Sequence, residues 1–212
     1  MQTLNKSIKL IKLSKGLNIK DFICTFFNIC TFMEFKHRIA KLDDIPNIEG
    51  LMLQSITKLL GYYVDEEELE ASFESMGLDD QLIKDKTYFL IFHGEILVGC
   101  GGWSNRKTLF GGNHTPNRSD DFLDPNIDAA KIRAMYTNPD WARKGVGTLI
   151  LKLAEKEASN SGFKKCELMA TLSGLHLYKE RGYKIDEETI YESKKGNKVK
   201  MFKMTKLLKS RT

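Results

Sequence analysis

The sequence has little of what a metal centre or a disulfide framework requires. Zinc sites and disulfide-stapled folds place cysteines and histidines at short, recurrent spacings, whereas this chain has four of each, scattered, and no CxxC pair. We therefore expect no bound metal. We expect the thiols to be free, in a reducing, cytoplasmic compartment. The residues concerned are Cys24, Cys30, Cys100 and Cys166, and His37, His93, His114 and His176.

The chain also lacks a hydrophobic run long enough to cross a bilayer. Its apolar stretch FICTFFNICTF, residues 22–32, is shorter than the ~20 residues of a membrane span, so we expect no stable membrane insertion. Five lysines and no acidic residue precede Asp21, which is typical of targeting peptides, but arginine and a small-residue cleavage motif are missing. We interpret residues 1–32 as an extension and 33–212 as the domain, with organelle targeting as the alternative.

An excess of positive charge is confined to that extension. It carries +4 of the formal net charge of +5, so the domain itself is nearly neutral at +1. Domains that bind nucleic acids present a basic face to the phosphates, and a nearly neutral domain gives no basis for one. We expect no nucleic-acid partner.

Hydrophobic periodicity predicts an α/β or α+β single domain. The clearest helix covers 145–161, where apolar residues share one face and Lys and Glu the other. A loop rich in Gly, Asn, Asp, Pro and Ser covers 105–129, and loops of that length are often functional or mobile. The other predicted segments are strands at 35–40, 87–92, 95–103, 130–137, 165–170, from 183, and at 198–208, and helices after Asp43 or Asp44, at 64–76 and at 175–181.

A Gly-x-Gly turn precedes the clearest helix. Gly145 and Gly147 permit positive φ and close backbone approach, and the first amides of a helix lack internal partners at the positive end of its dipole. Such a turn suits a phosphate, with Arg143 and Lys144 adding positive charge. Because no third glycine follows and no Gly-Lys-Ser/Thr is present, the dinucleotide and P-loop motifs do not apply. The turn is either an anion site or a site of tight packing.

Two stretches together resemble the GNAT superfamily of acetyl-CoA-dependent N-acetyltransferases. Residues 142–147, ARKGVG, match its phosphate loop Gln/Arg-x-x-Gly-x-Gly/Ala, except that Ala142 stands at the Gln/Arg position. Residues 177–183, LYKERGY, match a later signature of a tyrosine, a short charged run and Gly-Phe/Tyr. The resemblance extends from about Phe35 to Leu208, and the GCGGW of residues 99–103 also fits it.

The resemblance implies a fold, a co-substrate and site residues. The fold is a central mixed, mostly antiparallel twisted sheet with helices on both faces and a splayed strand pair at the cofactor site. Acetyl-CoA is the implied co-substrate, with its pantetheine arm along one splayed strand and its pyrophosphate on loop amides. Tyr178 is the implied general acid that protonates the leaving thiolate. The implied cofactor-binding residues are Met135, Tyr136 and Thr137 on the strand and Arg143, Lys144, Gly145, Val146, Gly147 and Thr148 in the loop.

The acceptor and the general base stay open at this level. The expected reaction moves an acetyl group to a primary amine of a small molecule or peptide, and a non-catalytic acyl-CoA-binding or sensing module is the alternative. Acceptor specificity would come from roughly 59–80 and 105–129, which a shared fold does not transfer. Arg133 faces either the core rim or the acceptor, and a homodimer is compatible with the sequence. The candidates for the base are Glu167, His114 and Asp121, besides a chain of waters.

Overall fold

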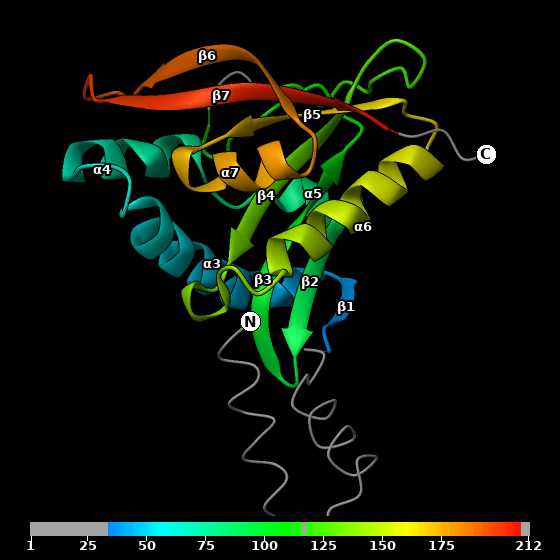
Figure 1. Ribbon diagram of the computed structural model, residues 1–212, viewed down its shortest axis with the longest axis horizontal. Helices are drawn as coiled ribbons and strands as arrows, with labels where there is room; N and C mark the ends of the chain where they lie inside the picture. Colours follow the sequence, from blue (N-terminus) through cyan, green and yellow to red (C-terminus); the bar gives the residue numbers. More distant parts are fainter. Residues whose placement is uncertain (1–33, 116–117, 209–212) are drawn as a thin grey trace, which may run out of the picture. The chain divides into compact units, whose positions relative to one another are not determined.

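The computed structural model describes residues 34–115 and 118–208. The unit Phe35–Thr212 is compact, and its described residues form a seven-stranded sheet in the order β1-β2-β3-β4-β5-β7-β6 (Figure 1). Neighbouring strands are antiparallel except β4 and β5, which are parallel. This confirms the predicted mixed, mostly antiparallel sheet. The extension predicted for residues 1–32 lies outside the described residues, and the division at residue 33 stays a prediction.

Strands and helices follow one another nearly in the predicted order. The strands are β1 (Lys36–Ile39), β2 (Tyr88–His93), β3 (Ile96–Ser104), β4 (Ala130–Thr137), β5 (Lys165–Ala170), β6 (Lys184–Glu192) and β7 (Lys198–Leu207). The helices are α3 (Ile45–Ser55), α4 (Glu66–Ser75), α5 (Asp80–Lys84), α6 (Val146–Asn160) and α7 (Leu172–Glu180), with short 3₁₀ turns at Leu42–Asp44 and Pro139–Trp141 and a π-helical end to α3 at Ile56–Leu60.

The first two helices begin at the local signals that predicted them. α3 follows Asp44 and has Pro46 in its first turn, where proline loses no helical hydrogen bond. α4 follows Asp65, whose carboxylate accepts from the Glu68 amide at 2.8 Å, while the Glu68 carboxylate accepts from the Asp65 amide at 3.2 Å. This reciprocal capping satisfies two amides that the helix leaves unpaired.

One helix was not predicted, and the start of another was predicted too late. α5 was not predicted, because a helix of five residues depends on burial of Leu82 and Ile83 rather than on a long periodic pattern. α7 begins at Leu172, three residues earlier than predicted, directly after the extended Thr171. Within the described parts of the chain, no helix is both long and apolar enough to cross a bilayer.

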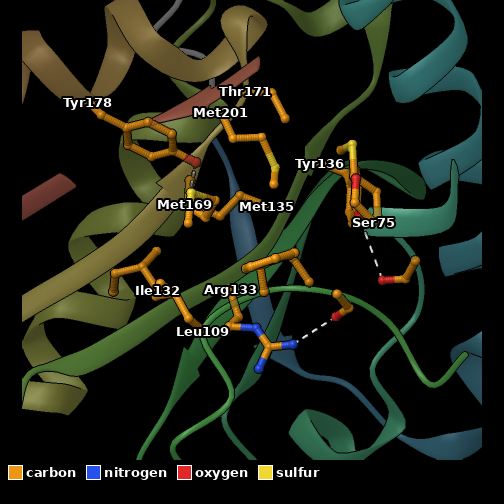
Figure 2. A pocket seen from close by; sticks show the side chains of 15 residues that line it. Ser75, Leu109, Ile132, Arg133, Met135, Tyr136, Met169, Thr171, Tyr178 and Met201 are labelled. Atoms are coloured by element: carbon orange, nitrogen blue, oxygen red, sulfur yellow. Dashed lines mark hydrogen bonds between the residues drawn. The ribbon is translucent and has the colours of Figure 1, made fainter. Parts of the chain in front are cut away.

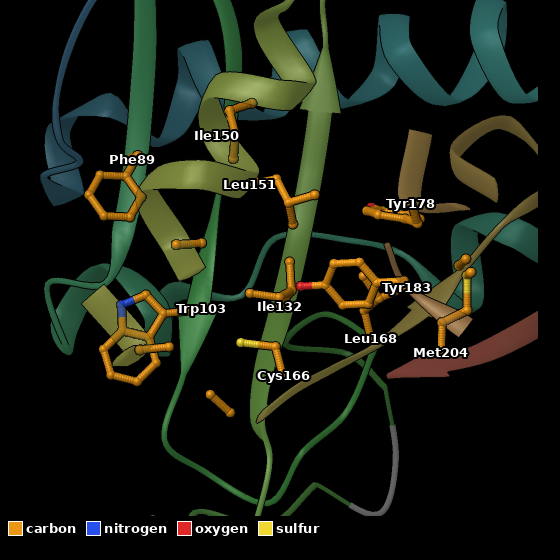
Figure 3. Packing of buried hydrophobic residues seen from close by; sticks show 14 of the residues in the cluster. Phe89, Trp103, Ile132, Ile150, Leu151, Cys166, Leu168, Tyr178, Tyr183 and Met204 are labelled. Atoms are coloured by element: carbon orange, nitrogen blue, oxygen red, sulfur yellow. The ribbon is translucent and has the colours of Figure 1, made fainter. Parts of the chain in front are cut away.

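Side chains along the strands alternate between two cores. On β2, Phe89 and Ile91 join the cluster formed with α6 and α7 (Figure 3), whereas Tyr88 and Leu90 join the cluster formed with α3 and α5. Helices therefore cover both faces of the sheet, as the resemblance implied. Ile150 of α6 is fully buried against the first face.

The long connection between β3 and β4 is tied to the domain by arginines. Arg106 donates to the Asp85 carboxylate through Nε at 2.6 Å and Nη2 at 2.8 Å. Arg133 of β4 donates to the carbonyls of Thr108 and Gly111, both at 2.7 Å. These contacts hold the first part of the connection against the sheet, so it forms a fixed wall there.

Candidate functional site

β4 and β5 lie side by side for only a short distance. Their parallel pairing ends where Lys131 stands opposite Glu167, and the two strands then part. Met135 and Thr137 follow this parting on β4, and the Thr137 amide donates to Ser55 Oγ of α3 at 3.3 Å. A strand without its neighbour offers main-chain groups to an extended ligand, which can add to it as a further strand.

A bulge on β4 lies within this gap. The register with β3 shifts so that Ala134 and Met135 together oppose Gly101, and Ala134 has a left-handed φ of 50°. The buried Tyr88 hydroxyl donates to the Ala134 carbonyl at 2.7 Å, and Cys100 Sγ lies 3.2 Å from the same hydroxyl oxygen. A Cβ on Gly101 would lie 3.0 Å from Met135 Cα. The glycines of GCGGW therefore allow the bulge to approach β3.

The predicted anion turn has the backbone conformation that such a site requires. Arg143 and Gly145 are both left-handed, with φ of 62° and 91°. The first turn of α6 is closed by the Leu149 amide, which donates to the Gly145 carbonyl at 3.0 Å. The amides of residues 146–148 thus have no partner inside the helix. Alternating right- and left-handed residues gather such N–H groups into a concavity that binds anions.

The two glycines of the turn have different roles. A Cβ on Gly145 would meet no heavy atom within 4 Å, so its φ alone favours glycine. A Cβ on Gly147 would lie 2.8 Å from Leu177 Cδ2, so this glycine allows α6 to approach α7. The neighbouring Lys144 Nζ lies 4.9 Å above the Trp141 ring, a cation–π contact that holds its charge at the tryptophan.

A cleft of about 750 Å³ runs along these elements. The end of α3, β4, the glycine turn and α7 line it. It brings together eight of the predicted site residues: Met135, Thr137, Arg143, Gly145, Val146, Gly147, Thr148 and Tyr178. Tyr136 and Lys144, also predicted to bind the cofactor, are not part of its lining. Tyr136 lines a neighbouring cavity, and the side chain of Lys144 faces Trp141.

The cleft also has walls that the sequence did not single out. Lys58, Tyr62 and Tyr63 line it from the end of α3, and His176 and Glu180 line it from α7. The two tyrosine rings stack edge to face at 5.1 Å, and Tyr62 is 81% exposed. Adjacent aromatic residues at a helix end were the available signal, because exposed apolar clusters mark binding surfaces.

Tyr178 stands at the inner end of the cleft. Its ring packs on the first turn of its own helix, where a Cβ on Gly174 would lie only 2.8 Å from the ring. Its edge meets Tyr183 at 5.9 Å between centroids, and its hydroxyl lies 3.7 Å from Met135 Sδ. Burial raises the pKa of Tyr178 to about 12. The phenol therefore keeps its proton at any ordinary working pH.

A smaller cavity of about 80 Å³ adjoins the cleft, and Met135 and Tyr178 line both (Figure 2). Arg133 is at its edge, with its side chain 2% exposed and ion-paired to the buried Asp79 at 2.8 Å. Asp79 also accepts from Arg118 Nη2 at 2.6 Å. Arg133 thus lies at the border between core and cavity, with its guanidinium committed to internal partners.

None of the three candidate bases lines either cavity. Glu167 is ion-paired with Lys131 and, at 3.6 Å, with Lys203. The His114 ring nitrogen Nε2 lies 2.9 Å from the Phe73 carbonyl, and Asp121 pairs with Lys107 at 2.9 Å. Each side chain has a structural partner away from Tyr178.

The described residues offer neither a reactive thiol nor a cluster of potential metal ligands. Cys100 and Cys166 are buried free thiols, and burial raises the pKa of each to about 12. Such thiols stay protonated and are poor nucleophiles. Within residues 34–115 and 118–208, no three His, Cys, Asp or Glu side chains gather as a potential metal site.

The chain matches one protein family over more than half of its length. The model of the acetyltransferase (GNAT) family covers residues 53–183. None of the curated proteins matches the chain. Solved structures that share the fold include a GCN5-related N-acetyltransferase from Rhodopseudomonas palustris (19% identity, 82% of this chain and 95% of that one, TM-score 0.61), the PaiA N-acetyltransferase of Thermoplasma acidophilum in complex with coenzyme A (17%, 83% and 100%, 0.55) and yncA of Salmonella typhimurium with its cofactor acetyl-CoA (12%, 84% and 96%, 0.58).

Proposed function

Because this chain belongs to the GNAT acetyltransferase family, we propose that it transfers an acetyl group from acetyl-CoA to a primary amine. One observation carries the proposal: a single cleft joins the glycine turn, the bulged β4 and the buried phenol of Tyr178. A diphosphate requires anion-binding amides, a pantetheine arm requires a free strand, and a thioester requires a proton donor for its leaving group.

In this proposal, main-chain groups make most of the contacts to the coenzyme. The amides of residues 143–148 hold the diphosphate, aided by the charge of Arg143, which lines the cleft. The pantetheine arm adds to β4 beyond its parting from β5, along the bulged Met135 and its neighbours Tyr136 and Thr137. Lys144 contributes its amide, since its side chain faces Trp141.

The chemical step is direct attack of the neutral amine on the thioester carbonyl. A C–N bond forms, the C–S bond breaks, and the Met135 amide stabilises the developing oxyanion. Tyr178 donates its proton to the departing thiolate and is reprotonated from solvent, while the proton lost by nitrogen leaves through water. Orientation of the two substrates supplies much of the acceleration. Transfer through a cysteine is disfavoured by the high pKa of both described thiols.

Calorimetry with acetyl-CoA, followed by a thiol-release assay over a panel of amines, tests this proposal. Gly145→Ala should weaken binding, because a Cβ strains a left-handed residue within the diphosphate turn. The matched control is Gly196→Ala between β6 and β7, where φ is 86° and a Cβ likewise meets no atom within 4 Å. Equal coenzyme affinity in both variants would contradict the assignment of the turn.

The same assay separates catalysis from sensing. Coenzyme binding without thiol release for any amine would instead favour a non-catalytic acyl-CoA-binding module. Release that depends on an amine, and that falls in Tyr178→Phe with unchanged coenzyme affinity, supports the enzyme. The absence of any heat with acetyl-CoA would reject both functions.

A further inference from the structure

The smaller cavity is placed where an acceptor amine has to arrive. It meets the coenzyme cleft at Met135 and Tyr178, whose Sδ and hydroxyl oxygen lie 3.7 Å apart. A thioester brought along β4 from the cleft reaches this junction from one side, which leaves the cavity as the approach for the amine. We propose, resting on the acetyltransferase function above, that the cavity binds the acceptor and selects a primary amine on a short, uncharged, apolar group.

The lining supplies the apolar part of this selectivity. We call the cavity the methionine pocket, because half of the eight methionines of the chain line it. Thioether side chains are uncharged, polarizable and flexible, so they pack around aliphatic groups of differing shape. Phe110 of the β3–β4 connection also packs with two of them around the buried Val199. The four methionines are Met76, Met135, Met169 and Met201.

The charges near the pocket disfavour a polycation. Among the described residues that line it, Arg133 carries the one full charge and no carboxylate is present. The carboxylate behind the wall, Asp79, is 1% exposed on its side chain and is shared by Arg133 and Arg118. This cluster has a net charge of +1. A second ammonium group in the pocket would meet repulsion and find no counter-charge, which rejects polyamines.

Apart from Tyr178, the polar side chains of the lining are already paired. Ser75 Oγ donates to the Ser72 carbonyl at 3.2 Å, and Thr171 Oγ1 lies 3.1 Å from Ser173 Oγ. The Arg133 guanidinium serves two loop carbonyls as well as Asp79. A hydroxylated or amide-rich acceptor thus gains little from these groups, whereas an aliphatic one loses nothing.

The volume limits the size of the group. A cavity of ~150 Å³ holds a benzene ring, so the 80 Å³ of the methionine pocket hold about three carbon atoms by the same measure. Propylamine and the first residue of a peptide that begins with alanine both offer this chemistry. They differ in the substituents that the amine-bearing carbon carries, so they serve as separate arms of one experiment.

The test measures kcat/KM for thiol release with the full chain and acetyl-CoA. Its arms are propylamine, an alanine-initiated peptide amide, putrescine and spermidine. We expect one of the first two to exceed both polyamines by at least tenfold, and the better of the two identifies the source of the amine. Polyamines that react as well or better would overturn the inference while leaving the acetyltransferase function intact. If none of the amines causes thiol release, the acetyltransferase function itself is rejected, and the inference with it.

A charge variant tests the pocket directly. Met169 is only partly buried, so Met169→Glu places a carboxylate in the pocket and should raise the ratio of putrescine to propylamine kcat/KM at least tenfold. Met169→Leu, matched in size and uncharged, should keep the wild-type order of preference. An unchanged ratio in Met169→Glu would contradict the proposed binding site.

Methyl NMR gives a readout that needs neither turnover nor a variant that folds poorly. In protein labelled at the methionine methyl carbon and saturated with coenzyme A, propylamine should shift the signals of Met76, Met169 and Met201. Met52 of α3, buried in the core on the other side of the sheet from α6, is the internal control and should not move. Unmoved pocket signals at saturating propylamine would overturn the proposal.

Discussion

Replacing Tyr88 by phenylalanine removes one oxygen atom and, with it, the hydrogen bond that holds the β4 bulge. Tyr88 is 2% exposed, and its hydroxyl reaches across β3 to the Ala134 carbonyl at 2.7 Å. A left-handed conformation costs a non-glycine residue ~1–2 kcal/mol, and Ala134 adopts one. The bond therefore offsets strain at the residue that precedes Met135.

Loss of this hydrogen bond should have two effects, one on stability and one on kcat, with different magnitudes. Leaving the half-buried carbonyl of Ala134 without this partner costs up to about 1–3 kcal/mol, so the free energy of unfolding should fall by at most roughly that amount. If the bulge relaxes, the Met135 amide moves away from the thioester oxygen, and a displacement of ~1 Å lowers kcat by up to ~10²-fold. Coenzyme affinity should change little, because the substitution leaves the proposed diphosphate site in the glycine turn intact.

Urea unfolding, calorimetry with coenzyme A and steady-state kinetics measure these three quantities in one preparation. Tyr183→Phe is the matched control, because Tyr183 is also buried and its hydroxyl has no hydrogen-bond partner within the described residues. It should retain its stability. A Tyr88→Phe protein that loses stability but keeps the wild-type kcat would refute a role of this bond in positioning Met135.

Further predictions concern the proton donor, its support and the ion pairs. Tyr178→Phe should lower kcat about 10²-fold, and the pH–rate profile of the wild type should rise as the amine deprotonates and show no descending limb up to about pH 10, since the pKa of Tyr178 is about 12. Gly174→Ala should displace the Tyr178 ring, because the new Cβ would lie 2.8 Å from it; a fall in kcat with an unchanged melting temperature supports this, and an unchanged kcat contradicts it. Arg106 holds the pKa of Asp85 below its usual value, so the pair stabilises the fold above pH ~4 and is lost as the pH falls through the lowered pKa. Asp85→Asn should therefore cost about 1 kcal/mol at pH 7 and progressively less in thermal melts as the pH falls through the lowered pKa of Asp85; a loss that does not change with pH would argue against the pair.

Local signals in the sequence predicted the parts of the candidate site that depend on backbone conformation. The Gly-x-Gly turn before an amphipathic helix could be recognised because its φ requirement is written into Gly145 itself. The fold class followed from the order of strands and helices together with the family motifs. α5 was not predicted, because its helical conformation depends on burial and not on a periodic pattern in its own sequence.

Contacts between residues distant in sequence could not be read from the chain. The pairing of Arg133 with Asp79, and the reach of Tyr88 to Ala134, both depend on which strands become neighbours. A pattern of alternating residues gives the face of a strand but not its partner. Lys144 illustrates the same limit, since the sequence does not reveal that its side chain lies over Trp141.

The short parallel seam between β4 and β5 makes the sheet two panels, β1–β4 and β5–β7, joined by few main-chain hydrogen bonds. In the proposed binding mode, a coenzyme at the end of that seam would touch β4 on one panel and, through α7, the other, and so would link the two. Occupancy should then slow amide exchange on both panels together, and add ~2.7 kcal/mol of stability at a hundredfold excess over Kd. Because main-chain bonds between the two panels are few and a shared hydrophobic core supplies most of their contact, a small molecule bound across the seam should stiffen both together.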